Sequence, residues 1–336
     1  MKLNQIRDVV IVAERGSLRS AARHLGVAQP SITRNIRELE HELGVELFER
    51  RVSGMVLTPL GEAFVRRATA IQLDLERARD EIQQLRGVAT GTITVALSTA
   101  AHLAMLPRIL PPFAKRFPDV RIKLVEGLFP AMEAGLHDGA IDFYVGPLGE
   151  NSMVAELVVE RLFDNFRMVV CRRNHPLAGA RSLAELSEAR WVATSVTWNR
   201  DAELGPVFER HNLPVPKISV EAQTGLSMML VAAHSDLLAM LPRQWQHLVD
   251  TAGLLQKIEV KETLTAPTIC IARRARLPLT PAAEYLCDLV RRAGLQDARA
   301  MAAAASASRN EGAAHQATPA ASTAASDQAG KRRRVR

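Results

Sequence analysis

The stretch from Ser17 to Glu40, SLRSAARHLGVAQPSITRNIRELE, holds two short helical patterns separated by a single glycine, Gly26. Ser17 is a good N-cap for the first helix, because its hydroxyl can accept a free backbone N–H. Pro30 stands in the first turn of the second helix, where its missing N–H costs nothing. The second helix opens with small, polar and basic side chains, which a helix built only to fill a core would not present. The pattern predicts a helix-turn-helix.

A helix-turn-helix places its second helix in the major groove of DNA, with the first turn nearest the bases. Glutamine can pair with adenine and arginine with guanine, while proline or a threonine methyl can pack against a thymine methyl. Two arginines open a predicted hairpin around Ser53 and Gly54 and are placed to hold phosphate. The candidate DNA-contacting residues are Ser17, Gln29, Pro30, Ser31, Thr33, Arg34, Arg37, Arg50 and Arg51.

The alternative for this region is a small helical domain with a solvated basic face. The net charge of +7 does not separate the two interpretations, because overall charge is a weak signal for a polyanionic partner. Part of that charge is local, since the final six residues, KRRRVR, contain five basic groups. The helix spacing, the glycine turn, the polar helix start and the basic hairpin together favour DNA binding.

One long helical pattern runs from Pro59 to about Arg86, with no breaker after Gly61. Its apolar positions alternate spacings of three and four, which is typical of a coiled-coil seam. The alternative is a single amphipathic helix lying on its own domain. Charged residues beside the seam favour a partner helix from a second copy of the chain. The candidate dimerisation residues are Phe64, Ala68, Ile71, Leu75, Ala78 and Ile82.

The pattern changes to alternating strands and helices after a short linker at 87–91. The first part reads as strand, helix, strand, helix, strand, which indicates a parallel sheet covered by helices on both faces. Two strands near 156–162 and 166–172 precede a second α/β series. We expect the last strand and helix to return to the first half.

Several classes of protein are disfavoured by what the sequence lacks. None of the nine histidines has the spacing of a metal motif, and no GxSxG, P-loop or GxGxxG occurs, so we expect no enzyme and no metal. The three cysteines are widely spaced and are expected to be reduced and buried. No apolar run approaches the length of a membrane span or a signal-peptide core, so we expect a cytoplasmic protein.

The first 90 residues resemble the LysR-type family of bacterial transcriptional regulators, and the resemblance continues to about residue 296. Thr33 departs from it mildly, because many members carry serine there. The tail beyond 296 lies outside the resemblance. The matching positions are Val9, Val12, Gly16, Ser17, Ala21, Ala22, Leu25, Gln29, Pro30, Ser31, Ile36, Leu39, Glu40, Leu43, Gly44, Leu47, Phe48, Arg50, Leu57, Thr58 and Gly61.

The resemblance implies an α+β multidomain protein with a winged helix-turn-helix, a linker helix that dimerises, and an effector domain of two α/β subdomains that is similar to periplasmic binding proteins. It also implies that the protein binds double-stranded promoter DNA, a small effector and RNA polymerase. The chain is expected to pair with a second copy and to form a tetramer, and to lie in the cytoplasm at the nucleoid. The expected divisions are 1–58 for DNA binding, 59–90 for the linker, 91–296 for the effector domain (subdomain I at 91–162 and 268–296, subdomain II at 163–267) and 297–336 for a tail.

Residues 297–336 are rich in alanine, serine, glutamine and threonine and show little apolar periodicity beyond alanine. This composition predicts a disordered tail, with the alternative that its alanine-rich start extends the last helix.

Hydroxyl-bearing residues and prolines stand at predicted strand ends in both halves of the α/β region. Ligands of such folds bind between the halves at the carboxyl ends of strands, and a helix start there favours an anion. Each residue alone could be an ordinary cap or turn residue. We expect the effector to be a small organic carboxylate or sulfonate, with no other cofactor. The candidate effector-binding residues are Ser98, Thr99, Pro147, Thr194, Ser195, Thr197, Thr224 and Pro242.

The sequence thus predicts a sequence-specific regulator whose activity a small effector modulates. One alternative is an architectural DNA-binding protein whose C-terminal domain only oligomerises. Another is a solute-binding module or an enzyme, which the absence of a signal sequence and of catalytic motifs disfavours.

Overall fold

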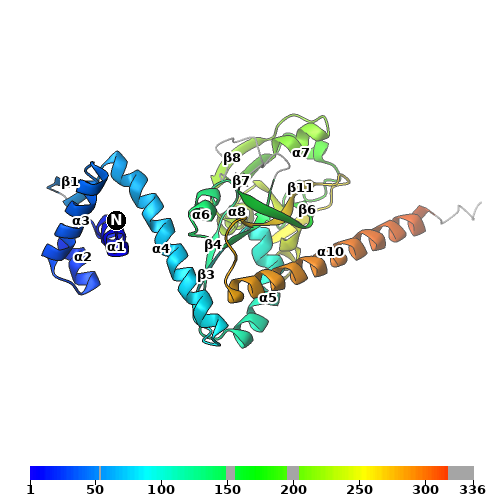
Figure 1. Cartoon of the computed structure of the whole chain (residues 1–336). Coiled ribbons are helices and arrows are strands. Elements are labelled where there is room, and N and C mark those ends of the chain that lie inside the picture. Colours follow the sequence, from blue (N-terminus) through cyan, green and yellow to red (C-terminus); the bar gives the residue numbers. More distant parts are fainter. Residues whose placement is uncertain (53, 149–155, 195–203, 317–336) are drawn as a thin grey trace, which may run out of the picture.

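The computed structural model describes residues 1–52, 54–148, 156–194 and 204–316 (Figure 1). A small N-terminal helical unit stands at one end of the long helix α4 (Pro59–Leu85), and a larger α/β body lies against the other end. The final helix, α10 (Pro281–Gln316), begins on the α/β body and runs beyond it.

The N-terminal unit is built on three helices whose apolar stripes meet in one core. Ser17 caps the second helix, where its Oγ accepts a hydrogen bond from the Ser20 N–H at 3.2 Å. Gly26 ends that helix with φ +65°, a left-handed conformation that glycine adopts without strain. The three helices are α1 (Leu3–Arg15), α2 (Leu18–Leu25) and α3 (Gln29–Leu43).

The predicted hairpin is an antiparallel pair, β1 (Phe48–Arg51) and β2 (Gly54–Leu57). The Glu40 carboxylate of α3 accepts from the Leu47 N–H at 2.8 Å and so holds the start of the hairpin. On the other strand, the Met55 N–H donates to the Gly16 carbonyl at 2.9 Å. The hairpin is therefore fixed to α3 and to the turn between α1 and α2.

Helix α4 begins at Pro59 and is capped by Thr58, whose Oγ1 accepts from the Gly61 N–H at 2.9 Å. Two of the candidate dimerisation residues, Phe64 and Ala68, pack against α1 of the same chain. Ala68 is 1% exposed, so it is covered by its own chain and a partner helix does not reach it in this conformation.

The rest of the seam is more open. Ile71 and Ile82 are 45% and 58% exposed, Ala78 is also exposed, and Leu75 is half-buried. The apolar seam of α4 therefore serves two surfaces. The side chains of its first third pack in the core of the N-terminal unit. Most of the remaining seam side chains are exposed to solvent.

The first half of the α/β body is a parallel sheet in the strand order β4-β3-β5, as its alternating pattern predicts. β11 (Thr265–Arg274) pairs antiparallel with β5, and α10 packs beside α5, so the last strand and helix do return to this half. The other elements of this half are β3 (Gly91–Leu97), α5 (Thr99–Arg116), β4 (Val120–Glu126), α6 (Glu133–His137) and β5 (Phe143–Pro147).

The two strands predicted near 156–162 and 166–172 are one continuous strand, β6 (Leu157–Arg172), so that prediction is wrong. The polar residues Asp164 and Asn165 look like a break in the sequence, but pairing carries the strand through them. Its first part pairs with β11, and its last part pairs with β9 and β10. β6 therefore belongs to both halves of the α/β body.

The second half continues the same sheet in the order β6-β9-β7-β8. Trp191 and Phe208 meet edge to face in its core, with ring centroids 5.6 Å apart. Helix α9 and strand β10 were not predicted, because they are short and their patterns are weak. The elements of this half are β7 (Arg190–Thr194), α7 (Gly205–Arg210), β8 (Lys217–Ala222), α8 (Gly225–Ala233), β9 (Leu238–Pro242), α9 (Gln246–Ala252) and β10 (Leu255–Ile258), with 3-10 turns at Leu183–Leu186 and Arg243–Trp245.

Helix α10 continues to Gln316, which agrees with the alternative that the alanine-rich start of the tail extends the last helix. Residues 317–336 lie outside the described residues. In the ranges that the structure describes, no helix combines the length and the apolar character needed to cross a membrane.

Gly61 provides a test of how α4 joins the N-terminal unit. A Cβ at this position would lie 2.0 Å from the Leu47 carbonyl oxygen, a backbone atom that cannot move aside cheaply. We expect Gly61→Ala to lower the free energy of unfolding of the N-terminal unit by about 1–3 kcal/mol, despite the better helix propensity of alanine. The measurement is urea unfolding followed by circular dichroism.

Glu62→Ala, on the exposed neighbouring residue, is the matched control and should change stability by no more than about 0.5 kcal/mol. Equal stability of Gly61→Ala and the wild type would contradict the close contact between α4 and the residue before the hairpin.

Candidate DNA interface and ligand cleft

The first turns of α3 gather most of the predicted DNA-contacting side chains on one face. Gln29, Pro30, Arg34 and Arg37 are exposed, whereas Ser31 and Thr33 are half-buried. A shallow depression on this face is lined by Gln29, Pro30, Thr33, Arg34, Arg37, Glu38 and His41. Side chains that can read base edges thus lie together at the start of an exposed helix.

Contacts with α1 fix the orientation of this face. Asp8 of α1 is 1% exposed, and its carboxylate accepts from Asn35 Nδ2 at 2.6 Å and from the Arg7 guanidinium at 2.9 Å. Gln5 Nε2 donates to Glu38 at 3.2 Å, and Glu38 lies 3.7 Å from Arg34. Sequence analysis missed Asp8 and Asn35, because a buried carboxylate on a helical stripe looks like an ordinary polar position.

The predicted hairpin arginines, Arg50 and Arg51, are both exposed on β1. Arg51 is paired with Glu49 at 2.8 Å, but this pair is open to solvent and holds the arginine weakly. Ser17 is used as the cap of α2, so its hydroxyl already accepts a backbone hydrogen bond. A phosphate at this helix start would therefore meet backbone N–H groups.

A cleft with a volume of about 220 Å³ lies between the two halves of the α/β body. Five of the eight candidate effector residues line it: Ser98, Thr99, Pro147, Thr194 and Pro242. Thr224 is not in the lining, but the residue after it, Gly225, is. Ser195 and Thr197 lie outside the described residues.

Two helices begin at this cleft. Ser98 caps α5, its Oγ accepting from the Ala101 N–H at 3.3 Å, and Thr224 caps α8, its Oγ1 accepting from the Ser227 N–H at 3.1 Å. Both hydroxyls act as caps, which is the ordinary role that each could have had alone. The partial positive charge of the two helix starts nevertheless falls on the same cavity, one from each half.

Sequence analysis missed three polar residues that line the cleft: Asn165, Arg167 and Trp245. Asn165 and Trp245 are 6% and 5% exposed, and among the described residues the Asn165 Oδ1 and Trp245 Nε1 atoms have no hydrogen-bond partner. Asn165 was missed because it fell in the supposed gap between two strands. The positive charge of Arg167 directly before the apolar run MVV of β6 could have indicated that a charged side chain faces the cleft.

Apolar residues complete the wall, among them Leu128, Phe129 and Met228. Tyr144 holds two residues of the lining in place, since its hydroxyl accepts from the Phe129 N–H and donates to the Pro147 carbonyl, each at 3.4 Å. Burial raises the pKa of Tyr144, so this hydroxyl stays protonated and can make both bonds.

Thr99 has a contact that the sequence did not indicate. Its hydroxyl donates to the Glu126 carboxylate at 3.0 Å, across the start of α5. The hydroxyl is thus already bonded to an anionic group at the rim of the cleft.

The chemistry of a redox or metal centre is not favoured in the described residues. All three cysteines are buried and unpaired, as expected. Burial raises the pKa of the Cys171 and Cys270 thiols and raises that of Cys287 to about 12. The reactive thiolate is therefore scarce at neutral pH. No group of three or more histidine, cysteine, aspartate or glutamate residues in the described ranges could hold a metal ion.

Two family models match the chain. Residues 3–62 match a bacterial regulatory helix-turn-helix protein of the lysR family, and residues 86–294 match the LysR substrate binding domain.

Known proteins are similar over most of the chain. The Hca operon transcriptional activator HcaR of Escherichia coli is 31% identical over 241 residues, 69% of this chain and 78% of that protein. The regulator TdcA of Escherichia coli is 23% identical over 83% of this chain and 89% of its own length. The structure of full-length CbnR with its target DNA superposes with a TM-score of 0.66 at 21% identity, covering 87% of this chain and 100% of that chain, which supports the fold.

Proposed function

The chain belongs to the LysR family of bacterial transcriptional regulators, and on that premise we propose that the exposed start of α3 reads operator bases while the cleft binds a small organic anion. Membership makes the chain a DNA-binding transcriptional regulator with an effector-binding domain, and not an enzyme. The observation that carries the DNA-reading assignment is the single exposed face that Gln29, Thr33, Arg34 and Arg37 share, fixed on α1 through Asp8.

In this proposal Gln29 and Arg34 contact base edges, with Pro30, Ser31 and Thr33 at the closest approach. Arg50 and Arg51 of the hairpin, together with the helix start at Ser17, contact phosphates, and Arg37 reaches a base or a phosphate. An architectural protein would gain most of its affinity from phosphate contacts. The polar face of α3 supports sequence reading instead.

The proposed divisions of the chain follow the sequence prediction, with one refinement. The DNA-binding unit spans 1–58, the linker helix and hinge 59–90, and the effector domain 91–296. The boundary between the subdomains at 162/163 falls inside β6, so the two subdomains share a strand and are not joined by a loop.

We propose that two copies pair through the uncovered part of the α4 seam. Ile71, Leu75, Ala78 and Ile82 recur at spacings of four, three and four, which places them on one face. Leu85 continues this face and is 68% exposed. Burial of these side chains between two helices would remove a continuous apolar stripe from water.

A tetramer requires a further contact between copies. Exposed leucines on the outer surface of both halves support one: Leu110 on α5, Leu124 on the edge strand β4, and Leu226 and Leu230 on α8. Leu226 and Leu230 are four residues apart on α8 and so share one face of that helix, and neighbouring exposed apolar side chains of this kind can contribute to protein contacts. Two dimers on one promoter would also present the regulator to RNA polymerase. HcaR is named as a transcriptional activator of an operon, which supports the proposal that this chain also activates transcription of a neighbouring operon. We propose that it does so in the cytoplasm.

The effector that best fits the cleft is a carboxylate or sulfonate on an apolar body. Arg167 and the starts of α5 and α8 favour an anionic group, and Phe129, Met228 and Trp245 offer an apolar wall. Asn165 Oδ1 and the Trp245 N–H, which have no partner in the part of the chain that the structure describes, suit an effector that carries a further polar group.

Arg34→Ala tests base reading. We expect operator affinity to fall by about 1–3 kcal/mol and base preference to relax at one position of each half-site, because a bidentate contact is lost. The measurement is binding-site selection from random DNA, followed by titration of the selected operator. Arg51→Ala is the comparison. It should weaken all sequences about equally and reduce the salt slope by about 1. Unchanged base preference in Arg34→Ala would reject its role.

Ile71→Asp and Ile82→Asp test the dimer. Each would bury a carboxylate in an apolar seam, which is costly without a partner, so we expect the dimer dissociation constant to rise roughly tenfold or more. Sedimentation equilibrium measures it. The matched control is Gln83→Asp, on an exposed residue beside the seam. Dimers as tight as those of the wild type in both isoleucine variants would place the dimer contact elsewhere.

A thermal-shift panel of organic carboxylates and sulfonates tests the effector class, because a ligand that binds only the folded state raises apparent stability. We expect Arg167→Gln to weaken the best hit roughly tenfold or more, through lost hydrogen bonds to a charged group, without loss of operator binding. Arg161→Gln, an exposed arginine of β6, is the control. A panel without hits would reject the anionic class.

A further inference from the structure

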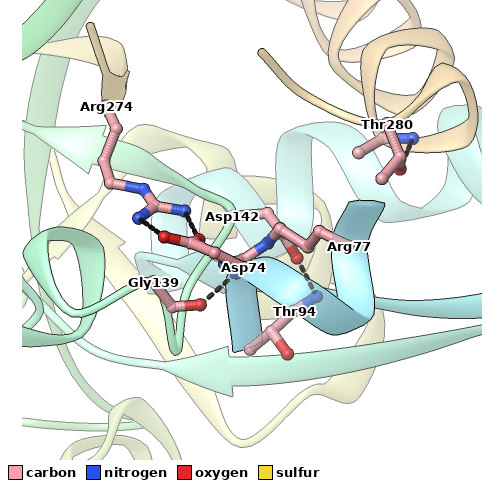
Figure 2. Close-up of polar contacts among 8 residues, drawn as sticks. Asp74, Arg77, Thr94, Gly139, Asp142, Arg274 and Thr280 are labelled. Atoms are coloured by element: carbon pink, nitrogen blue, oxygen red, sulfur yellow. Dashed lines mark hydrogen bonds and ion pairs between the residues drawn. The ribbon is translucent and has the colours of Figure 1, made fainter. Parts of the chain in front are cut away.

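The polar face of α4 is docked on the α/β body of its own chain (Figure 2). Arg77 Nε donates to Asp142 Oδ1 at 2.7 Å, and Arg274 Nη2 donates to Asp74 Oδ1 at 2.7 Å. One turn beyond Asp80, the Gln84 side chain accepts from the Ala282 N–H at 2.9 Å. These contacts lie on a different face from the apolar seam, so one helix can bind a partner and its own α/β body together.

The ionic part of this contact is neutral and largely removed from water. Arg77 also bonds Asp74, at 3.1 Å, and the Gly139 carbonyl, so two arginines face two aspartates. The side chains of Asp142, Arg274 and Arg77 are 7%, 16% and 18% exposed, and that of Asp74 is 35% exposed. Ion pairs at such burial are screened much less by salt than surface pairs.

Two glycines allow the helix to come this close. Gly139 has φ +75°, and a Cβ there would lie 2.6 Å from Arg77 Nη1. A Cβ on Gly91 would lie 2.4 Å from the Asp80 carboxylate. Both positions lack a side chain where the helix makes its nearest approach, which a chance contact between a linker and a domain would not require.

Three neighbouring strands connect this contact to the ligand cleft. Asp142 immediately precedes β5, whose last residue, Pro147, lines the cleft. Arg274 is the last residue of β11, and Pro267 near the other end of β11 lines the cleft as well. On β3 the Thr94 N–H donates to Asp142 Oδ2 at 2.7 Å, and the strand ends just before Ser98.

We propose that Asp74, Arg77, the Gly139 carbonyl, Asp142 and Arg274 form an ionic clasp by which the effector domain sets the direction of the linker helix and hence the spacing of the paired DNA-binding units. The proposal rests on the proposed function for its DNA consequence. The helix has two states, docked and released, and the effector shifts their balance by binding the cleft more tightly in one of them. The strands β3, β5 and β11 join the two sites.

Arg77→Gln and Arg274→Gln test the clasp in the full chain without any ligand. Each leaves an aspartate partner without its cation, so the docked state should lose population. We expect amide hydrogen exchange over residues 70–86 to speed up at least tenfold. We also expect the DNase I footprint on DNA selected by the wild type to change in length by at least one helical turn, whereas affinity for a single half-site stays within twofold.

The controls are Arg79→Gln on the same helix and Arg276→Gln beyond the end of β11, both exposed and equal in charge change. Exchange in these should stay within twofold of the wild type. The proposal is overturned if the clasp variants exchange like the wild type, if the controls speed up equally, or if exchange rises with no change in the footprint.

Failure of the two proposals can be told apart. If the wild type selects no DNA sequence, the proposed function fails together with the DNA part of the clasp proposal. Hydrogen exchange then still decides whether the clasp holds the helix. If the wild type selects DNA and the clasp variants match it in exchange and footprint, only the clasp is rejected.

Discussion

The 27-residue helix α4 connects the N-terminal unit, which carries the DNA-contacting face, to the α/β body, which contains the ligand cleft. The position of the face relative to the cleft therefore depends on how this helix is held at each end. The first third of α4 is part of the N-terminal core, through Phe64 and Ala68 on α1. Its second half is held by Asp74, Arg77 and Gln84 on the α/β body. Only a short stretch around Ile71 lies between the two attachments. The helix therefore acts as a rigid arm, since the backbone bonds of an uninterrupted helix leave little freedom to bend.

The order of elements was largely predictable from the sequence, because it depends on local signals. Gly26 and Ser17 set the helix-turn-helix, and the strand and helix patterns of the first half appear where periodicity placed them. Partners distant in the chain were not predictable. β6 was read as two strands because Asp164 and Asn165 interrupt its apolar pattern, and only its pairing with β9, β10 and β11 shows that it continues.

The same limit applies to the sites. Ser98, Thr99 and Pro147 were found because strand ends are local features, whereas Arg167 and Trp245 enter the cleft through long-range packing. Asp74 and Arg77 are among the charged residues beside the seam, which the sequence pattern related only to a partner helix. Periodicity shows which residues share a helix face, but not what covers that face. The partners Asp142 and Arg274 are 65 and 200 residues away in sequence.

The position of β11 bears on how the protein is made. This last strand of the sheet lies between β5 and β6, in its interior. Until Arg274 has left the ribosome, both neighbours present unpaired edges, which invite association with other chains. The N-terminal unit, whose core extends to Ala68 of α4, can fold long before that. A nascent chain therefore carries a finished DNA-binding unit while its effector domain is still open, and a chain cut short before β11 would retain the first without the second.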